Sequence, residues 1–513
     1  MRRNPDTSPR RTSPVRRRVL AGGTGLAAAL ALGIGPAAPA SADSAGLDEL
    51  VTVDAVRGHL ENFQTIADYN GGNRATNTPG YDVAANYVID QLEQAGYKPE
   101  KQSYDFELWR EKTDPVFAQT APEQRDYVEE EDFLTMTYSP AGEVEAGVVP
   151  VDTDGTDSGC TADDFADFPA GQIALMKRGT CAFSEKVQLA ADAGASAAIV
   201  YNSGASEAPE DQDVFSGTLE TEGAIPAVGT SHPVGAELAA AEGAEARLEI
   251  DASVEEKTSY NIIADASGGA EDNVVVVGAH LDGVPEGAGI NDNASGSGAL
   301  LETAIQFAEL DAKPKNKVRF AWWGTEEEGL IGSTEYVAGL SEKELDDLGL
   351  YLNFDMIGSP NFGRFIYDGR GELPGSGTPP AGSAAIQKLF EDYYDKQGLV
   401  TEPTEFSGRS DYAAFMEAGI PSGGLFSGGD GVKTEEQAEW YGGTPGEDYD
   451  PNYHTAADDI DNISWTSVEQ LSAGMAYAVE SYSVSTLPVN GRVRTLDATE
   501  SFSFDKRGEE WVR

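Results

Sequence analysis

Short apolar runs alternate with longer amphipathic segments over the second half of the chain. The apolar runs are almost uninterrupted and lie at 274–277, 318–323 and 350–354. A strand that helices cover on both faces of a parallel sheet has this pattern. Segments with helical spacing lie between or after these runs, at 294–310, 382–397 and 464–483. The alternation predicts an α/β domain with a mostly parallel, mixed central sheet and helices on both faces.

The beginning of the chain also carries helical patterns. Apolar positions recur at helical spacing over 47–70 and 80–96, with Pro79 before the second segment and Gly96 at its end. Both segments predict helices, because proline favours a helix start and glycine a helix end. Residues 111–132 carry proline, glutamine and charge without periodicity, and predict a connecting segment.

A stretch of different texture separates these two regions. Between about 135 and 250 the chain is rich in Ala, Gly and Asp. Its patterns predict strands at 173–176 and 197–201, with a helix over 184–193 between them. We interpret this stretch as a small domain inserted into the larger one.

The first 42 residues have the pattern of a signal peptide. Seven arginines precede an apolar, small-residue run at 19–34, and Ala-Ser-Ala follows at 40–42. The run is shorter than the roughly 20 residues that span a bilayer, and the Ala-x-Ala pattern predicts cleavage after residue 42. The arginines at 16–18 also fit a twin-arginine signal, so either export route is expected. The mature protein is therefore expected to be secreted.

The chain is strongly acidic, and its charge excludes several partners. Its 513 residues contain 35 Lys+Arg and 88 Asp+Glu, a net charge of −53, and loss of residues 1–42 would make this −59. Phosphate backbones and anionic membrane surfaces attract Lys and Arg. Neither nucleic acid nor a membrane is an expected partner. With 40% hydrophobic residues the chain can bury a large core, which excludes disorder.

The cysteine count limits the metal chemistry. Two cysteines cannot form a Cys-rich metal centre, which needs about four Cys or Cys/His ligands. Since disulfides persist outside the cytoplasm, Cys160 and Cys181 are expected to pair. Two free thiols are the alternative, because spacing does not show that the Cβ atoms approach. Any metal must be held by carboxylate and histidine side chains.

Metal-capable side chains follow each of the three apolar runs. His280 and Asp282 follow the first run, Glu326-Glu327-Glu328 the second and Asp355 the third. In an open α/β sheet the ligand crevice lies outside the carboxyl ends of the strands, so these clusters are expected to meet. His454, in a loop before the last long helix, adds a second histidine.

Two histidines and several carboxylates suit a pair of divalent ions. Imidazole and carboxylate both bind zinc at about 2.0–2.2 Å, and two ions roughly 3.5–4 Å apart can clamp a hydrolytic water and a carbonyl oxygen. The chain has no His-Glu-x-x-His and no Gly-x-Ser-x-Gly motif. A single-zinc peptidase and a serine hydrolase therefore lose their main support.

Several ordered and widely spaced segments resemble the secreted dizinc leucine aminopeptidases of peptidase family M28. They are NGGNRATNTPGYD (70–82), GAHLD (278–282), GINDNASG (289–296), WWGTEEEGLIGS (322–333), YLNFDMIGSPN (351–361), GRSDY (408–412) and DPNYHTA (450–456). Residues 145–250 resemble the protease-associated (PA) domain of larger members, through SGC (158–160), DFPAGQIALMKRGTCAF (167–183) and AGASAAIVYN (193–202). The resemblance implies the zinc-peptidase (phosphorylase/hydrolase-like) fold with a small β-rich α+β PA domain inserted.

The resemblance also implies limits for the parts of the chain. They are a signal peptide at 1–42, a peptidase domain at 43–134 and 253–485, the PA domain at 135–252, and a C-terminal extension at 486–513. The extension contains a strand-like segment at 501–504, and its role is open.

The resemblance assigns the metal ligands residue by residue. His280, Glu327, Asp355 and His454 would hold two zinc ions per chain, with Asp292 bridging them. The motifs leave open a calcium ion, for which the sequence carries no readable signature.

It assigns the catalytic and substrate-binding residues as well. Glu326 would be the general base, and Tyr453 would donate a hydrogen bond to the developing oxyanion. Asp282 would orient His280. Glu326 and Asp355 would receive the free α-amine of the substrate, and Met356 and Arg409 would line its pocket.

The chain departs from the family around the last histidine. Members often carry a cysteine on each side of it, and here these positions are Asn452 and Ala457. We therefore expect packing alone to hold this loop. His59 and His232 are expected to be packed or solvent-facing residues, not ligands.

Together these features imply a secreted zinc-dependent aminopeptidase, expected to be a monomer, that removes N-terminal, preferably apolar, leucine-like residues from peptides and proteins. One alternative is a family relative with another acyl substrate, such as a carboxypeptidase or a glutaminyl cyclase. Another is a non-catalytic binding protein on the same fold. The presence of all five ligands and the base argues against the latter.

Overall fold

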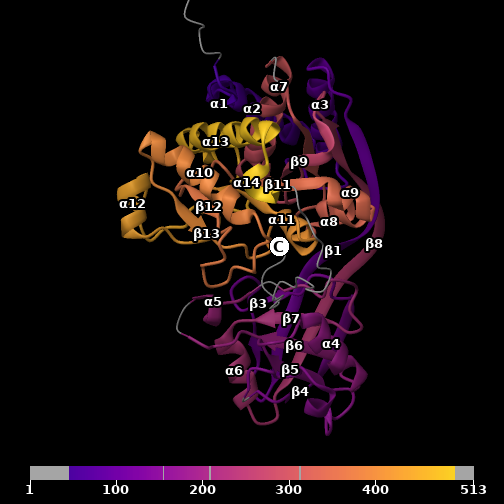
Figure 1. Ribbon diagram of the computed structural model, residues 1–513. Helices are drawn as coiled ribbons and strands as arrows, with labels where there is room; N and C mark the ends of the chain where they lie inside the picture. The colour runs from indigo at the N-terminus through magenta and orange to yellow at the C-terminus, as the bar shows by residue number, and fades with distance from the viewer. Residues whose placement is uncertain (1–44, 154, 207–208, 216, 311–312, 492–513) are drawn as a thin grey trace, which may run out of the picture. The chain divides into compact units, whose positions relative to one another are not determined.

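Three helices and four strands come first along the part of the chain that the structure describes, and from β5 (Ile173–Lys177) onward strands and helices mostly alternate (Figure 1). This computed structural model describes residues 45–153, 155–206, 209–215, 217–310 and 313–491. The expected signal peptide and the strand-like segment at 501–504 lie outside the described residues. Among the described helices, none combines the length and the apolar character needed to cross a membrane.

The strands of the larger domain form a mixed, mostly parallel sheet in the order β13, β12, β14, β11, β9, β10, β8. β14, β11, β9 and β10 run parallel to one another, whereas β12 is antiparallel to β14 and β8 is antiparallel to β10. The expected fold class is confirmed. The bounds are β8 Glu245–Asp265, β9 Ala270–His280, β10 Asn316–Trp323, β11 Leu348–Phe354, β12 Phe365–Tyr367, β13 Glu402–Thr404 and β14 Ser422–Phe426.

Helices cover both faces of this sheet, and β9 is accordingly apolar on both faces. Val275 and Val277 pack into one buried cluster, and Val274 and Val276, which alternate with them, pack into another. The first cluster includes α1 (Leu47–Leu50), α2 (Val53–Tyr69), α3 (Pro79–Gln94), α7 (Gly296–Glu309), α10 (Ser383–Gln397), α13 (Trp465–Val484) and α14 (Leu487–Asn490). The second includes α8 (Ile331–Ala338) and α11 (Tyr412–Glu417), with α9 (Glu342–Asp347) packed against it, while α12 spans Glu435–Tyr441.

The prediction of a connecting segment at 111–132 is wrong for residues 111–121, which belong to a strand. β1 (Glu100–Ala121) is a long strand, antiparallel to β8 along nearly its whole length, and β2 (Arg125–Asp126) pairs with it. The register of β1 against β8 shifts three times between Glu111 and Ala121, and Pro115 lies at one of these shifts. Bulges interrupt the alternation of side chains on which a strand prediction depends.

The inserted domain is a small sheet with helices on its faces. Its strands lie in the order β4, β5, β6, β7, β3, with β4 to β7 parallel and β3 antiparallel to β7. The predicted strands and the helix between them appear as β5, β6 and α4. The bounds are β3 Phe133–Thr135, β4 Gly142–Pro150, β5 Ile173–Lys177, α4 Phe183–Asp192, β6 Ala197–Tyr201, α5 Pro209–Gln212, β7 Ala227–Thr230 and α6 His232–Ala240.

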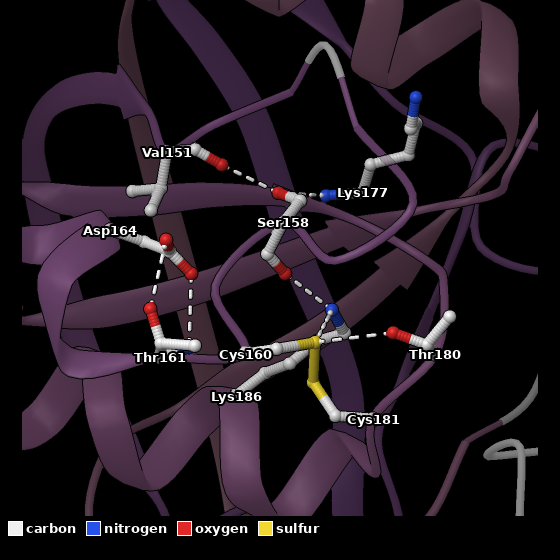
Figure 2. The surroundings of a disulfide bond; sticks show 9 residues. All are labelled: Val151, Ser158, Cys160, Thr161, Asp164, Lys177, Thr180, Cys181 and Lys186. Atoms are coloured by element: carbon white, nitrogen blue, oxygen red, sulfur yellow. Dashed lines mark hydrogen bonds between the residues drawn. A yellow bond between two sulfur atoms is a disulfide. The ribbon is translucent and has the colours of Figure 1, made fainter.

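Cys160 and Cys181 form the expected disulfide, with their Cα atoms 5.8 Å apart (Figure 2). Lys186 of α4 is buried beside it, donates to the carbonyl oxygen of Ser158 and lies with its Nζ 3.4 Å from Cys160 Sγ. Burial lowers the pKa of Lys186 to about 8. The disulfide therefore ties the loop before β5 to the start of α4.

Replacing both cysteines by serine is expected to lower the free energy of unfolding by about 3 kcal/mol, because the open chain regains the conformational freedom that the disulfide removes. The two positions are 21 residues apart in sequence. Urea denaturation of the wild type and the double variant measures the change. Equal urea midpoints would show that the disulfide does not stabilise the fold.

Candidate active site

Three neighbouring parallel strands end at one edge of the sheet. The register pairs Trp323 at the end of β10 with His280 at the end of β9, and Asn353 of β11 with Gly278. The residues that follow these strands therefore emerge side by side, as expected for the crevice at the carboxyl ends of a parallel sheet. The predicted site residues of β9, β10 and β11 lie together for this reason.

Asp292 lies between the two histidines. Its Oδ1 is 3.1 Å from His280 Nε2, and its Oδ2 is 3.1 Å from His454 Nε2. Each carboxylate oxygen thus faces a different imidazole. Asp292 belongs to an irregular helical turn, Ile290–Ser295, in the loop between β9 and α7, whereas His454 belongs to the loop before α13.

Further carboxylates complete two groups around these histidines. Glu327 Oε2 is 3.1 Å from His454 Nε2, and Asp355 Oδ1 is 3.1 Å from His280 Nε2. Glu326 Oε2 lies 4.0 Å from the same nitrogen of His280. Two overlapping sets have their ligand atoms within 4.8 Å of one another: His280, Asp292 and Glu327, and His280, Glu326 and Asp355.

The donor set fits divalent metal ions such as zinc. It consists of imidazole nitrogen and carboxylate oxygen, which are zinc ligands, on side chains that are all buried or nearly so. Within the described part of the chain, Glu327 Oε1 is buried and has no hydrogen-bond partner. A bare carboxylate oxygen in a buried site is costly unless a cation compensates it. The residues that would hold such ions are His280, Asp292, Glu327, Asp355 and His454.

Burial and crowding shift the pKa values of these groups. Burial raises the pKa of Glu327 to about 7, with repulsion from Asp292 adding to it. Burial opposes the charged form of His454, but Glu327 and Asp292 raise its pKa to about 10. The pKa of His280 is raised well above its ordinary value, because Glu326 and Asp355 outweigh the effect of burial. The carboxylates therefore demand positive charge, which protons or metal ions supply.

A cavity of about 410 Å³ opens onto this cluster. Glu326 and Tyr453 both line it, and the Tyr453 ring stacks on His454 with centroids 3.8 Å apart. Burial raises the pKa of Tyr453 well above its ordinary value, so its hydroxyl keeps its proton and can donate it in a hydrogen bond. Met356 and Arg409 line the same cavity, and Arg409 pairs with Asp430 at 3.3 Å.

Asp282 holds the loop that bears the glutamates. Its two carboxylate oxygens accept the backbone N–H groups of Glu326 and Glu327 at 3.2 and 3.3 Å. Towards His280 it offers its backbone carbonyl oxygen, 3.1 Å from Nδ1, while its carboxylate is 3.9 Å from the same atom. Asp282 therefore touches two of the three clusters.

Two residues beside the site had no role assigned from the sequence. Ser410 donates its hydroxyl to Asp355 Oδ2 at 2.5 Å. Asp411 is buried, burial raises its pKa to about 8, and its charge helps to raise the pKa of Glu326. Both stand in the GRSDY motif, so the motif was a signal for them. The hydrogen bond to Asp355 and the electrostatic effect on Glu326 depend on a loop far along the chain.

Hydrogen bonds hold the loop of His454, so the expectation that packing alone holds it is wrong. Asn452 donates its side-chain amide to Asn462 Oδ1 at 2.7 Å. Asn462 in turn donates to the buried carboxylates of Asp450 and Asp458. A network of amide and carboxylate groups thus ties Asn452, one of the two positions expected to carry cysteine in relatives, to the chain that follows His454. Sequence patterns do not reveal such a network, since its members pair only after folding.

The other two histidines lie outside the site. His59 is buried in α2, 2.7 Å from the Tyr87 hydroxyl and 3.2 Å from Glu302 Oε2. His232 begins α6 of the inserted domain and lies with Nδ1 3.0 Å from the carbonyl oxygen of Asn202. Both have structural partners.

Comparison with known proteins matches the chain to two families. The family described as Peptidase family M28 matches residues 261–479, and the PA domain matches residues 144–238. An aminopeptidase of Pseudomonas aeruginosa is 45% identical over 453 residues, covering 87% of this chain and 84% of that protein. A probable lipoprotein aminopeptidase of Mycobacterium tuberculosis is 40% identical over 473 residues, covering 90% and 91%.

Solved structures share the fold. An aminopeptidase from Aneurinibacillus sp. strain AM-1 aligns with a TM-score of 0.67 and 28% identity, covering 84% of this chain and 94% of that one. A zinc aminopeptidase from Bacillus subtilis aligns with a TM-score of 0.58 and 24% identity, covering 84% and 95%.

The fold and the site define a metalloexopeptidase with a helix-covered mixed sheet. The chain belongs to peptidase family M28 and carries an inserted PA domain. This membership implies peptides as the substrates.

Proposed function

We propose that the protein is a secreted aminopeptidase that uses two zinc ions to remove apolar, leucine-like residues from the N-termini of peptides. The observation that carries the proposal is the position of Asp292, whose two carboxylate oxygens each lie 3.1 Å from a different histidine. A carboxylate placed in this way can bridge two metal ions, one on each side. Glu327 beside His454 and Asp355 beside His280 supply a further carboxylate to each.

The residues of the chain have distinct roles in the proposed reaction. Bound zinc would supply Lewis acidity to the scissile carbonyl and to a water molecule. Glu326 takes a proton from that water and passes it to the leaving amine. Tyr453 donates its hydroxyl hydrogen bond to the oxygen of the scissile carbonyl as negative charge develops there. Asp282 keeps Glu326 in place by accepting its backbone N–H.

The cavity supports a preference for an apolar N-terminal residue. Beyond the carboxylates it is lined by the apolar or aromatic side chains of Met356, Phe365, Tyr367, Leu373, Phe426 and Tyr449. Glu326 and Asp355 line the same cavity, and their negative charge suits a free α-ammonium group. A side chain of leucine size can then bury its surface against the aromatic walls. Met356 contributes apolar contact to the pocket, and Arg409 contributes positive charge.

A chelator experiment tests the proposal. The protein is expected to release p-nitroaniline from Leu-p-nitroanilide, to lose this activity in 1,10-phenanthroline, and to regain it on addition of Zn²⁺. N-acetyl-Leu-p-nitroanilide, which lacks the free amine, is the control and should not be cleaved. Release that a chelator does not reduce would sink the metallopeptidase mechanism, and equal cleavage of the acetylated substrate would sink the aminopeptidase specificity.

We also propose the organisation of the chain. The peptidase domain comprises 43–134 and 253–485, the PA domain 135–252, and an extension 486–513. The family matches at 261–479 and 144–238 support this division, although β3 of the inserted sheet begins at residue 133 and β8 continues through residue 252 from one domain into the other. Residues 1–42 act as a signal peptide, which the lipoprotein relative supports, and the mature protein is a monomer.

A further inference from the structure

A buried arginine donates hydrogen bonds to the loop that carries Asp292. Arg74 lies in the segment between α2 and α3, and its side chain is fully buried. It donates from Nε to the carbonyl oxygen of Ala288 at 3.0 Å, and from its two other nitrogens to the carbonyl oxygens of Leu281 and Gly289. One guanidinium thus gathers both ends of the loop between His280 and Asp292.

A buried aspartate accepts hydrogen bonds from backbone N–H groups of the same loop. Asp458 is 2% exposed, and its two carboxylate oxygens accept the backbone N–H groups of Asn291 and Asp292 at 2.8 and 3.0 Å. Its backbone carbonyl oxygen accepts the N–H of Ile290 at 3.2 Å. Asp458 lies four positions after His454, whose Nε2 is 3.1 Å from Asp292 Oδ2.

The hydrogen-bonding chemistry of Arg74 and Asp458 is complementary. A guanidinium has several donors in a rigid plane and no acceptor, so it binds converging carbonyl oxygens. A carboxylate only accepts, so it binds N–H groups. Burial lowers the pKa of Arg74 to about 10, with Asp282, Asp458 and Asp292 opposing the shift, so the side chain is charged at neutral pH. Neither residue lines the cavity.

We infer that Arg74 and Asp458 are positioning residues that together fix Asp292 between the two metal sites, so that simultaneous binding of two zinc ions depends on them. This inference rests on the proposed function. A bridging ligand must satisfy two ions at once, so a small displacement of its backbone weakens both sites. Groups that orient metal ligands typically change metal affinity about 10–100-fold when they are removed.

The test measures zinc directly, not only activity. The variants are Asp458→Asn, which keeps the size of the side chain, Arg74→Met, which removes the charge and the donors, and Arg74→Lys, which keeps the charge alone. Zinc bound per chain is measured at a series of free Zn²⁺ concentrations set by a chelator. We expect Asp458→Asn and Arg74→Met to bind the second ion about 10–100-fold more weakly than the wild type. The zinc affinity of Arg74→Lys is expected to lie between those of the wild type and Arg74→Met.

Two matched variants separate positioning from general destabilisation. Arg364 is also buried and donates to a backbone carbonyl oxygen, that of Val400, away from this loop. Asp459 neighbours Asp458 but accepts the N–H of Asp461 instead. Arg364→Met and Asp459→Asn are expected to keep wild-type zinc affinity.

The outcomes distinguish the inference from the proposed function. Two zinc ions bound to Asp458→Asn with wild-type affinity would overturn the inference while leaving the proposed function intact, and Asp458→Asn decides this even if Arg74→Met does not fold. An equal loss in Asp459→Asn or Arg364→Met would also overturn it. A wild type that binds no zinc would overturn both.

Discussion

Replacing Glu326 by alanine is expected to lower kcat for Leu-p-nitroanilide about 10²–10⁴-fold, the range typical for loss of a general acid or base. Its carboxylate lines the cavity and lies 4.0 Å from His280 Nε2, farther than Asp292 or Asp355. Burial raises its pKa well above the ordinary value of a carboxyl. A general base works best when its pKa lies near the operating pH, so an upward shift from the ordinary value suits this role.

The zinc content of the Glu326→Ala variant distinguishes a base from a ligand. We expect two zinc ions per chain to remain, measured by atomic absorption after gel filtration. Glu328→Gln is the matched control, because Glu328 is the next acid but one and pairs with Arg110 of β1 at 2.5 Å instead of lining the cavity. Retained activity in Glu326→Ala, or an equal loss in Glu328→Gln, would show that the base is misassigned.

The metal-free protein is expected to lose stability as the pH rises from 6 to 8. Several buried groups around the site have native pKa values above their ordinary values because burial disfavours their carboxylates, or because neighbouring carboxylates favour their protonated imidazoles. They are Asp282 (about 6), Glu327 and Asp458 (about 7), Asp411 (about 8) and His454 (about 10). Without metal, the native state therefore binds more protons than the unfolded state in this range.

The sign and size of the effect follow from proton linkage. Where the native state binds more protons, the free energy of unfolding falls with rising pH, by about 1.4 kcal/mol per pH unit for each proton. For the acids this loss extends from about pH 4, their unfolded value, to their native values, and for His454 from about pH 6.5 to about 10. Since several groups contribute and neighbouring groups share protons, we expect a fall of at least about 1.4 kcal/mol per pH unit near pH 7.

Thermal melting at pH 6, 7 and 8, with chelator and with Zn²⁺, measures this effect. Ordinary carboxylates are ionised in both states over this range, so they add little. With zinc bound, the cations replace the protons and the melting temperature should change much less. Asp411→Asn should reduce the slope of the metal-free protein, because it removes one of the buried acids. A metal-free melting temperature that is constant or rises towards pH 8 would contradict the expectation.

The sequence by itself predicted the three strands that carry the site. The apolar runs of β9, β10 and β11 are buried on both faces, and such strands need no long-range information to be recognised. The ligand candidates follow these strands directly, so His280, Glu327 and Asp355 could be expected at one edge. His454 was a further candidate by residue type, and the ordered motifs added Asp292 through their resemblance to peptidase family M28.

β1 was not predicted, because its residues pair with a strand more than a hundred positions away and its bulges break the alternation. A pattern records the burial of side chains along one segment, and much of β1 is exposed or half-buried on both faces. Backbone hydrogen bonds to β8 stabilise it instead, and these leave no sign in the choice of residues.

The tertiary structure alone decided how the site is held together. Ser410 reaches Asp355, Asp282 holds the backbone of Glu326, and Arg74 and Asp458 grip the loop of Asp292 from two distant parts of the chain. Most of these contacts join a side chain to backbone N–H or carbonyl groups, which every residue carries, so the partner cannot be read from residue type. The sequence determined which side chains can hold a metal and where their strands end. Only folding determined which backbone groups orient them, because those hydrogen bonds depend on the meeting of loops that lie far apart along the chain.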